Sequence, residues 1–203
     1  TDTALKSGDT STVTIVFSEA VTGFSSDADV TAPNGTLAAM TSEDNITWTG
    51  TYTPTADVED AINVLTLGTT WTDTAGNAYG GASTDTANFT IDTTAPTVTG
   101  VDSSTNAGTY KEGDAISIQV TFSEAVTVTG TPQLTLETGG SDAVVDYVSG
   151  STTNVLTFTY TVGAGETSSD LDYASTTALA LNGGTVKDAV GNNATLTLAA
   201  VGA

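Results

Sequence analysis

Two stretches of the chain repeat one another and decide the fold. Residues 6–22 read KSGDTSTVTIVFSEAVT and residues 111–127 read KEGDAISIQVTFSEAVT, so they align without a gap at an offset of 105 residues. In the first copy, the apolar residues Val13, Ile15 and Phe17 alternate with other residues. Such alternation over about four to eight residues is typical of a β-strand with one buried face. The chain is therefore predicted to contain two copies of one β-rich unit.

A shorter repeat supports this division. Residues 73–77 read DTAGN and residues 188–192 read DAVGN, at an offset of 115 residues, so the second copy has longer loops. The junction lies in IDTTAP, residues 91–96, where Pro96 suits the start of a strand because it donates no ladder hydrogen bond. We predict a first domain over residues 1–93 and a second over residues 94–203, each large enough for its own core.

The two copies differ at their starts. The second opens with TVTGV, residues 97–101, which reads as a first strand, and the first copy has no counterpart to it. We therefore expect the first domain to lack its N-terminal strand and the chain to be a piece of a longer protein.

Further segments alternate in the same way, with threonine on the polar face. They are residues 46–53, 116–122 and 156–162. Threonine is β-branched, favours strands and hydrogen-bonds to water. Glycine, Asn and Asp turns fall at short intervals, and no segment has sustained helical periodicity. The pattern predicts an all-β fold of two tandem immunoglobulin-like antiparallel β-sandwiches joined end to end.

Composition excludes several functions. The chain has 24 acidic residues, three lysines, no His and no Cys, for a net charge of −21; it also has no Arg. Without His and Cys there is no Ser-His-Asp or Cys-His catalysis and no ordinary zinc site. The negative charge opposes nucleic acid and anionic membranes. No apolar run approaches the roughly 18 residues that span a bilayer, so we expect no membrane insertion.

The repeated motifs together resemble a known family. FSEAVT at residues 17–22 and 122–127, the DxxGN turns and the DTTAP junction are similar to the bacterial Ig-like repeats of large repeats-in-toxin surface adhesins, which include biofilm and ice-binding adhesins. The resemblance covers essentially the whole chain. It implies a secreted protein of the bacterial cell surface, in which such domains are tandem stalk modules and calcium at the junctions stiffens the array.

Calcium binding is the one chemistry that the residues themselves support. A hard cation takes about six to eight oxygen ligands, several of them carboxylates. If each copy has immunoglobulin topology, its loops gather at two poles. Stacking the copies end to end would then bring acidic residues from the pole where the chain leaves the first copy towards acidic residues from the pole where it enters the second. The candidate ligands at the junction are Asp57, Glu59, Asp60, Asp92, Glu124 and Asp188, and Glu19 and Asp73 are their counterparts at the N-terminal end.

Structural roles are open for the same residues. Asp73 and Asp188 suit an Asx turn with the following glycine at positive φ. Glu19 and Glu124 could be solvated strand ends, and residues 56–60 a solvated acidic loop between strands. Asp9 and Asp114, which follow a glycine, are predicted to form turns.

The function predicted from the sequence is structural. We expect a monomeric, non-enzymatic stalk segment of a secreted adhesin, with Ca²⁺ rigidifying the junction and neighbouring repeats of the same chain as its partners. Other domains of the adhesin would contact a surface glycan or peptide. The alternative is a Ca²⁺-dependent carbohydrate- or peptide-binding module, carried by loops 138–152 or 163–176 of the second copy, with Tyr147 and Tyr173 as contacts. Paired carboxylates could in principle hydrolyse glycosides, but no cleft-forming insertion is evident.

Overall fold

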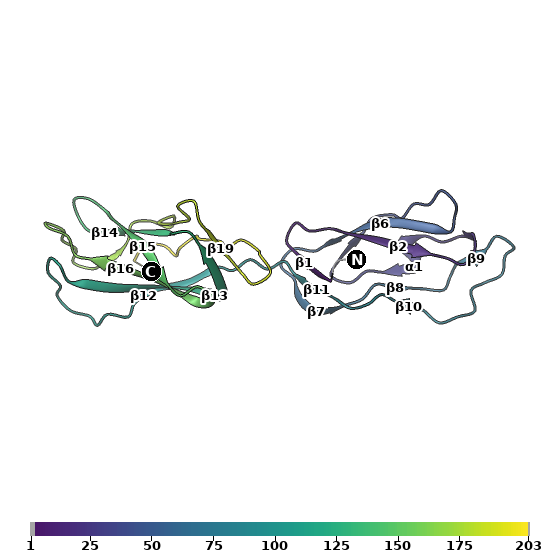
Figure 1. Cartoon of the computed structure of the whole chain (residues 1–203), viewed down its shortest axis with the longest axis horizontal. Coiled ribbons are helices and arrows are strands. Elements are labelled where there is room, and N and C mark those ends of the chain that lie inside the picture. Colours follow the sequence, from purple (N-terminus) through teal and green to yellow (C-terminus); the bar gives the residue numbers. More distant parts are fainter. Residues whose placement is uncertain (1–2, 203) are drawn as a thin grey trace. The chain divides into compact units, whose positions relative to one another are not determined.

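The chain folds into two compact units that meet between Thr94 and Ala95, here called unit 1 and unit 2. The computed structural model describes residues 3–202. Strands dominate both units, and the helix α1 (Ser26–Asp29) is a single turn (Figure 1). The predicted all-β fold of two tandem immunoglobulin-like sandwiches is confirmed.

Unit 1 is built from short strands, many of them only two or three residues long. They are β1 (Ala4–Lys6), β2 (Ser11–Val16), β3 (Val21–Thr22), β4 (Val30–Thr31), β5 (Gly35–Leu37), β6 (Thr47–Pro54), β7 (Glu59–Asn63), β8 (Thr66–Leu67), β9 (Thr72–Asp73), β10 (Thr84–Asp85) and β11 (Phe89–Asp92). One sheet has the order β2-β6-β5 and another the order β1-β11-β7, in which β1 runs parallel to β11. Smaller ladders join β10-β8-β4 and β3-β9.

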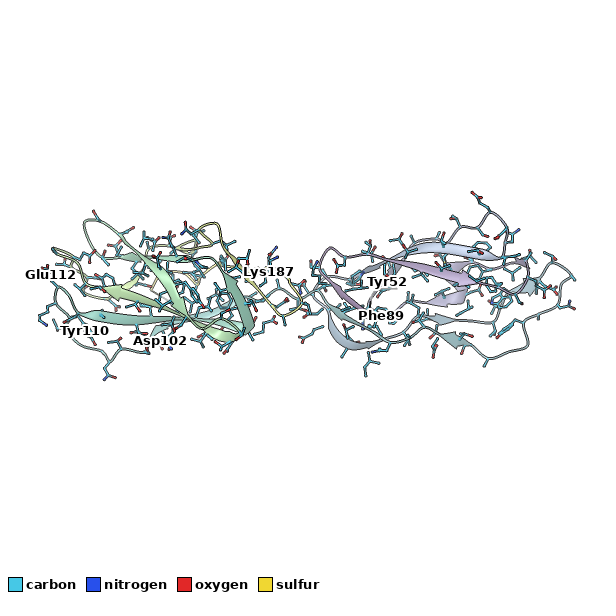
Figure 2. The ribbon with its side chains drawn as sticks, viewed as in Figure 1. Tyr52, Phe89, Asp102, Tyr110, Glu112 and Lys187 are labelled. Carbon is cyan, nitrogen blue, oxygen red and sulfur yellow. The ribbon has the colours of Figure 1, made fainter. Side chains whose placement is uncertain are left out.

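The core of unit 1 follows the predicted alternation. Val13 and Phe17 are buried, whereas Thr12 and Thr14, on either side of Val13, are exposed. Tyr52 of β6 and Phe89 of β11 meet edge to face inside the unit, with ring centroids 5.6 Å apart (Figure 2). Trp48 and Trp71 are partly buried and pack against this core.

Unit 2 has longer strands and one continuous set of pairings. Its strands are β12 (Val98–Ser103), β13 (Ala115–Thr129), β14 (Gln133–Glu137), β15 (Ala143–Ser149), β16 (Thr153–Thr161), β17 (Asp172–Tyr173), β18 (Leu179–Ala180) and β19 (Thr185–Lys187). The order is β12-β13-β16-β15-β14-β17, with β18 on β14 and β19 on β13.

Two strands of unit 2 change partners along their length. β13 pairs with β12 as far as Phe122 and with β16 as far as Val126, with a register shift between Thr121 and Val126, and its last residues pair with β19. β15 pairs first with β14 and then with β16. Strands that change sheets at such irregularities form the corners of a sandwich. The apolar face of β13, with Ile118, Val120 and Phe122, is buried in the core.

The repeated KxGD sequence forms the same turn in both units. The Lys6 backbone N–H donates to Asp9 Oδ2 over 3.1 Å, and the Lys111 N–H donates to Asp114 Oδ2 over 3.0 Å. In each copy the lysine Nζ also bonds to the aspartate Oδ1, and the intervening glycine has positive φ. The predicted turn role of both aspartates is confirmed.

Candidate metal-binding carboxylates

Asp188 accepts several hydrogen bonds from its own turn. Its Oδ1 accepts the backbone N–H groups of Val190, Gly191 and Asn192 over 2.9, 2.6 and 2.8 Å, and its Oδ2 accepts the Asn192 Nδ2 over 2.7 Å. Asp188 and Asn192 are each only 4 % exposed, and Gly191 has φ of 102°. The carboxylate therefore holds the turn closed, and few of its lone pairs point away from the turn.

Asp73 occupies the equivalent turn of unit 1 and is more accessible. Its Oδ1 accepts the Asn77 backbone N–H over 2.8 Å, and its Oδ2 accepts the Asn77 Nδ2 over 2.7 Å. These hydrogen bonds, the side-chain bond first, lower the pKa of Asp73 below its ordinary value. Both DxxGN turns are thus Asx-type turns with glycine at positive φ, as the sequence allowed.

The far end of unit 1 brings two predicted ligands together. In the β7–β11 ladder, Glu59 lies directly opposite Asp92. Directly opposed residues of an antiparallel pair have Cβ atoms about 4.5–5.5 Å apart, so like charges there repel. Asp92 Oδ1 also accepts the Thr94 N–H over 3.2 Å. Asp57, in the turn before β7, is exposed and has φ of 57°.

The interpretation of residues 56–60 as one acidic loop is wrong. Glu59 and Asp60 belong to strand β7, so their side chains point to opposite faces of the sheet. Asp60 lies opposite the buried Ile91, and its two oxygens accept the Asn34 Nδ2 and the Ile62 N–H over 2.8 and 2.9 Å. Pairing with β11 overrides the weak apolar pattern of EDAIN.

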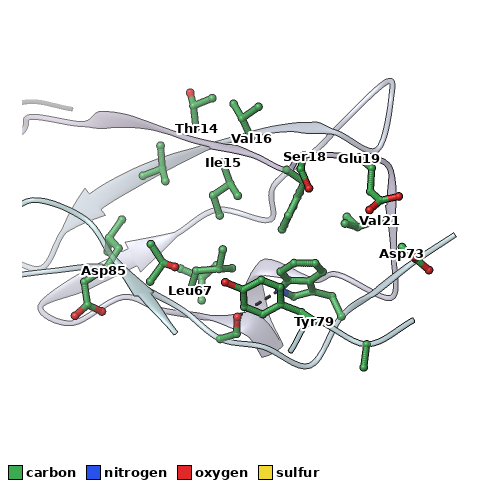
Figure 3. A pocket seen from close by; sticks show the side chains of 18 of the residues that line it. Thr14, Ile15, Val16, Ser18, Glu19, Val21, Leu67, Asp73, Tyr79 and Asp85 are labelled. Atoms are coloured by element: carbon green, nitrogen blue, oxygen red, sulfur yellow. Dashed lines mark hydrogen bonds between the residues drawn. The ribbon is translucent and has the colours of Figure 1, made fainter. Parts of the chain in front are cut away.

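The glutamates of the FSEAVT motif lie beside the DxxGN turns of their own units. In unit 1, the exposed Glu19 lines the same cavity as Asp73 (Figure 3), and Val21 pairs with Asp73 in the β3–β9 ladder. In unit 2, Glu124 follows Ser123, whose N–H donates to the Thr97 carbonyl over 2.8 Å, so Glu124 lies at the end where the chain enters the unit.

The fit to calcium is partial. Residues 3–202 contain no group of three or more acidic side chains placed to hold one metal ion. Since Ca²⁺ takes about six to eight oxygens, the Glu59–Asp92 pair of unit 1 would supply only part of its coordination. Carbonyl and water oxygens, or a further carboxylate, would have to complete it.

Sequence reasoning missed two buried polar residues of unit 1. Asp29, 4 % exposed, accepts the Ser25 N–H on Oδ2 over 2.9 Å and the Thr70 hydroxyl on Oδ1. Asn63, fully buried, accepts the Asn34 Nδ2 on Oδ1 over 2.8 Å. Their partners are distant in sequence, and the only local signal was the Asn34-Gly35 turn dipeptide.

The fold and these carboxylates define a class of protein, the acidic tandem immunoglobulin-like β-sandwich. A family model described as a bacterial Ig-like domain matches residues 1–91, and a second model of the same description matches residues 92–200. The chain therefore belongs to the bacterial Ig-like domain family. Neither the curated proteins nor the solved structures yielded a match.

Membership has coarse consequences for function. Bacterial Ig-like domains are typically structural modules, often of surface proteins, and they are usually extracellular or surface-exposed. Within residues 3–202, no helix has the length and apolar character needed to cross a bilayer.

Proposed function

We propose that the chain is an extender segment of a large secreted bacterial adhesin of the repeats-in-toxin type, in which Ca²⁺ at the junction between repeats rigidifies the array. The proposal goes beyond family membership in three respects: the parent protein, the metal and its place. Acids that end unit 1 and acids that begin unit 2 would share the ion. Without a cation, these carboxylates repel one another in a chain whose net charge is −21.

The observation that carries the proposal is the short connector between the units. Thr93 is buried in unit 1, where its N–H and hydroxyl donate to the Val58 and Thr55 carbonyls, each over 2.7 Å. Pro96 already belongs to unit 2, since its carbonyl accepts the Thr195 N–H over 2.8 Å. Only two residues lie between these anchors. A flexible tether would need a longer, Gly/Ser-rich stretch, so the connector suits a stiff array.

Thermal unfolding and small-angle X-ray scattering, with millimolar calcium and with excess chelator, test the proposal. Calcium should raise the melting temperature and lengthen the particle. At a hundredfold excess over Kd, one ion bound only by the folded state adds about 2.7 kcal/mol. The double substitution Glu59→Gln and Asp92→Asn should remove this response.

A matched control separates ligation from simple loss of charge. Glu43→Gln with Asp142→Asn removes two exposed carboxylates from other loops and should leave the calcium response intact. The calcium proposal would be wrong if neither melting nor scattering of the unsubstituted chain responded, or if the Glu59–Asp92 variant responded fully.

A cavity of about 980 Å³ in unit 2 favours a second candidate, a Ca²⁺-dependent carbohydrate- or peptide-binding module. Ligand sites commonly have about 300–1,000 Å³. Tyr110, Tyr173 and Asp170 line the cavity, so it includes part of the predicted loop 163–176. Tyr147 lies elsewhere, where its hydroxyl accepts the Ser151 N–H.

The hydroxyls of the tyrosines that line this cavity are already engaged. Tyr160 donates to Glu166 Oε2 over 2.8 Å, and burial first, then this bond, raises the pKa of Tyr160 to about 12. Tyr173 donates to the Ala199 carbonyl over 3.0 Å. A glycan array probed with calcium and with chelator would support this candidate if binding required calcium and fell with Asp170→Asn. Binding that ignored both changes would count against it.

A further inference from the structure

Unit 1 contains a single lysine, Lys6, and no Arg or His, because Lys111 and Lys187 belong to unit 2. Strand β1 pairs in parallel with β11, and this ladder places Lys6 opposite Asp92. On the other side of β11, the antiparallel ladder with β7 places Glu59 opposite Asp92. Asp92 therefore lies on the middle strand, between a second acid and the one lysine of unit 1.

These three side chains share the outer face of the sheet formed by β1, β11 and β7 (Figure 1). Successive residues of a strand point to opposite faces. Leu5 is buried in the core, so Lys6, the next residue, points away from it. Ile91 is buried as well, so Asp92 also points outward. Glu59 is exposed and lies directly opposite Asp92, so it belongs to the same face.

The ammonium of Lys6 is held in place by the KxGD turn. Its Nζ donates to Asp9 Oδ1 over 2.9 Å, and its side chain is 38 % exposed. Lys111 makes the same bond to Asp114 in unit 2, but its side chain is 84 % exposed. Lys111 belongs to none of the strands that the structure describes, so it makes the turn without an acidic strand residue opposite it.

We propose that Lys6 is the protein's own counter-ion for the Glu59–Asp92 pair, and that a calcium ion must compete with it there. Like charges that lie opposite one another in a ladder repel, and an adjacent ammonium offsets part of that repulsion. The same ammonium repels a divalent cation that approaches these carboxylates. Lys6 would thus set the calcium concentration at which the site fills, and this part of the inference rests on the proposed function.

The two lysines separate this role from the turn. An exposed ion pair such as that between Lys6 and Asp9 contributes little stability by itself. If Lys6 served only the turn, Lys6→Met and Lys111→Met would have the same small effect, each on its own unit. If Lys6 is a counter-ion, its replacement should also depend on whether Glu59 and Asp92 are charged.

The counter-ion role is tested in excess chelator by urea unfolding of unit 1, followed by tryptophan emission. Lys6→Met keeps the aliphatic stem and removes the charge. It should lower the folding equilibrium constant about fivefold more in the unsubstituted chain than in the Glu59→Gln, Asp92→Asn variant, as expected for charges about one strand spacing apart in water. Lys6→Arg, which keeps the charge, should behave like the unsubstituted chain. Equal effects of Lys6→Met in the two backgrounds would overturn the inference.

The competition is tested by the melting temperature as calcium is added. Lys6→Met should lower the calcium concentration of half-maximal effect about fivefold, because the ammonium no longer repels the ion. Lys111→Met should leave this concentration unchanged. No shift with Lys6→Met, or an equal shift with Lys111→Met, would overturn the inference.

The inference and the proposed function fail in different measurements. If no variant responded to calcium, the proposed function would be wrong, and the coupling in chelator would alone decide the role of Lys6. If calcium acted but Lys6 showed no coupling to Glu59 and Asp92 in chelator, the inference would be wrong and the proposed function would stand.

Discussion

Replacement of Asp188 by alanine tests whether this carboxylate serves mainly to stabilise the turn or mainly to bind a metal ion. The side chain accepts four hydrogen bonds and is 4 % exposed. Alanine leaves all four donors without their acceptor. Water can reach the N–H of Val190, which is 41 % exposed, but reaches Asn192 poorly, because that residue is only 4 % exposed.

The two bonds to Asn192 therefore dominate the cost. A hydrogen bond to a charged group contributes about 1.5–3 kcal/mol, so we expect Asp188→Ala to lower the free energy of unfolding of unit 2 by about 3 kcal/mol. In a domain of this size, that lowers the melting temperature by about 12 °C or more. Asp188→Asn keeps the Oδ1 acceptor and should cost about half as much, since its amide would face the Asn192 amide as a second donor.

The assay can follow the two units separately. Both tryptophans, Trp48 and Trp71, lie in unit 1, so tryptophan emission reports that unit while far-ultraviolet circular dichroism reports both. Urea unfolding in excess chelator should show the loss in the dichroism transition and none in the tryptophan transition. Asp73→Ala is the matched variant in unit 1 and should cost less, because the two hydrogen bonds that Asn77 donates to Asp73 come from an exposed residue.

The reasoning would be refuted by a loss below about 1 kcal/mol for Asp188→Ala in chelator. A loss of stability that appeared only with calcium present would also refute it. That result would mean that Asp188 contributes to stability mainly as a metal ligand and only weakly as a turn residue.

Three further predictions concern single side chains. The pKa of Asp73 is lower in the folded state, so its ionised carboxylate stabilises unit 1 at pH values above the unfolded pKa of about 3.9. This stabilisation is lost as the pH falls through the folded pKa. Asp73→Asn should therefore make the stability of unit 1, followed by tryptophan emission, depend less on pH in the acid range. Asn63→Ala should lower the stability of unit 1 by about 3 kcal/mol, because it removes the acceptor of one of the two Asn34 amide hydrogens and the side-chain donor to the Asp60 carbonyl inside the fold, and the same emission assay measures it. Tyr160→Phe should remove, from an ultraviolet absorbance titration, one phenol that ionises near pH 12.

The sequence predicts the long strands and the repeated turns well. β2, β13 and β16 are found because their apolar residues recur at every second position and are buried. The KxGD and DxxGN turns are found because glycine at positive φ and an aspartate acceptor are local requirements.

Elements fixed by distant partners escape sequence reasoning. The two-residue strands β3, β4, β8, β9, β10, β17 and β18 are too short for any period to show. β7 has little apolar alternation and is a strand because β11 pairs with it. Asn63 and Asp29 are polar residues whose burial depends on Asn34 and Thr70, which lie 29 and 41 residues away in the chain. Pattern and propensity carry no information about such partners.

Comparison of the two copies separates the acids into two groups. Aspartates that recur in both copies, at the KxGD and DxxGN turns, have their oxygens bonded to the turn in both, so repetition alone is evidence for the fold and not for a metal. Glu59 and Asp92 are different, because they do not belong to a repeated turn and the β7–β11 ladder places their like charges opposite one another, with Lys6 opposite Asp92 on its other side. A bound cation would relieve that repulsion. The calcium hypothesis is therefore tested most sharply at this pair, and the recurring turn aspartates are its natural controls.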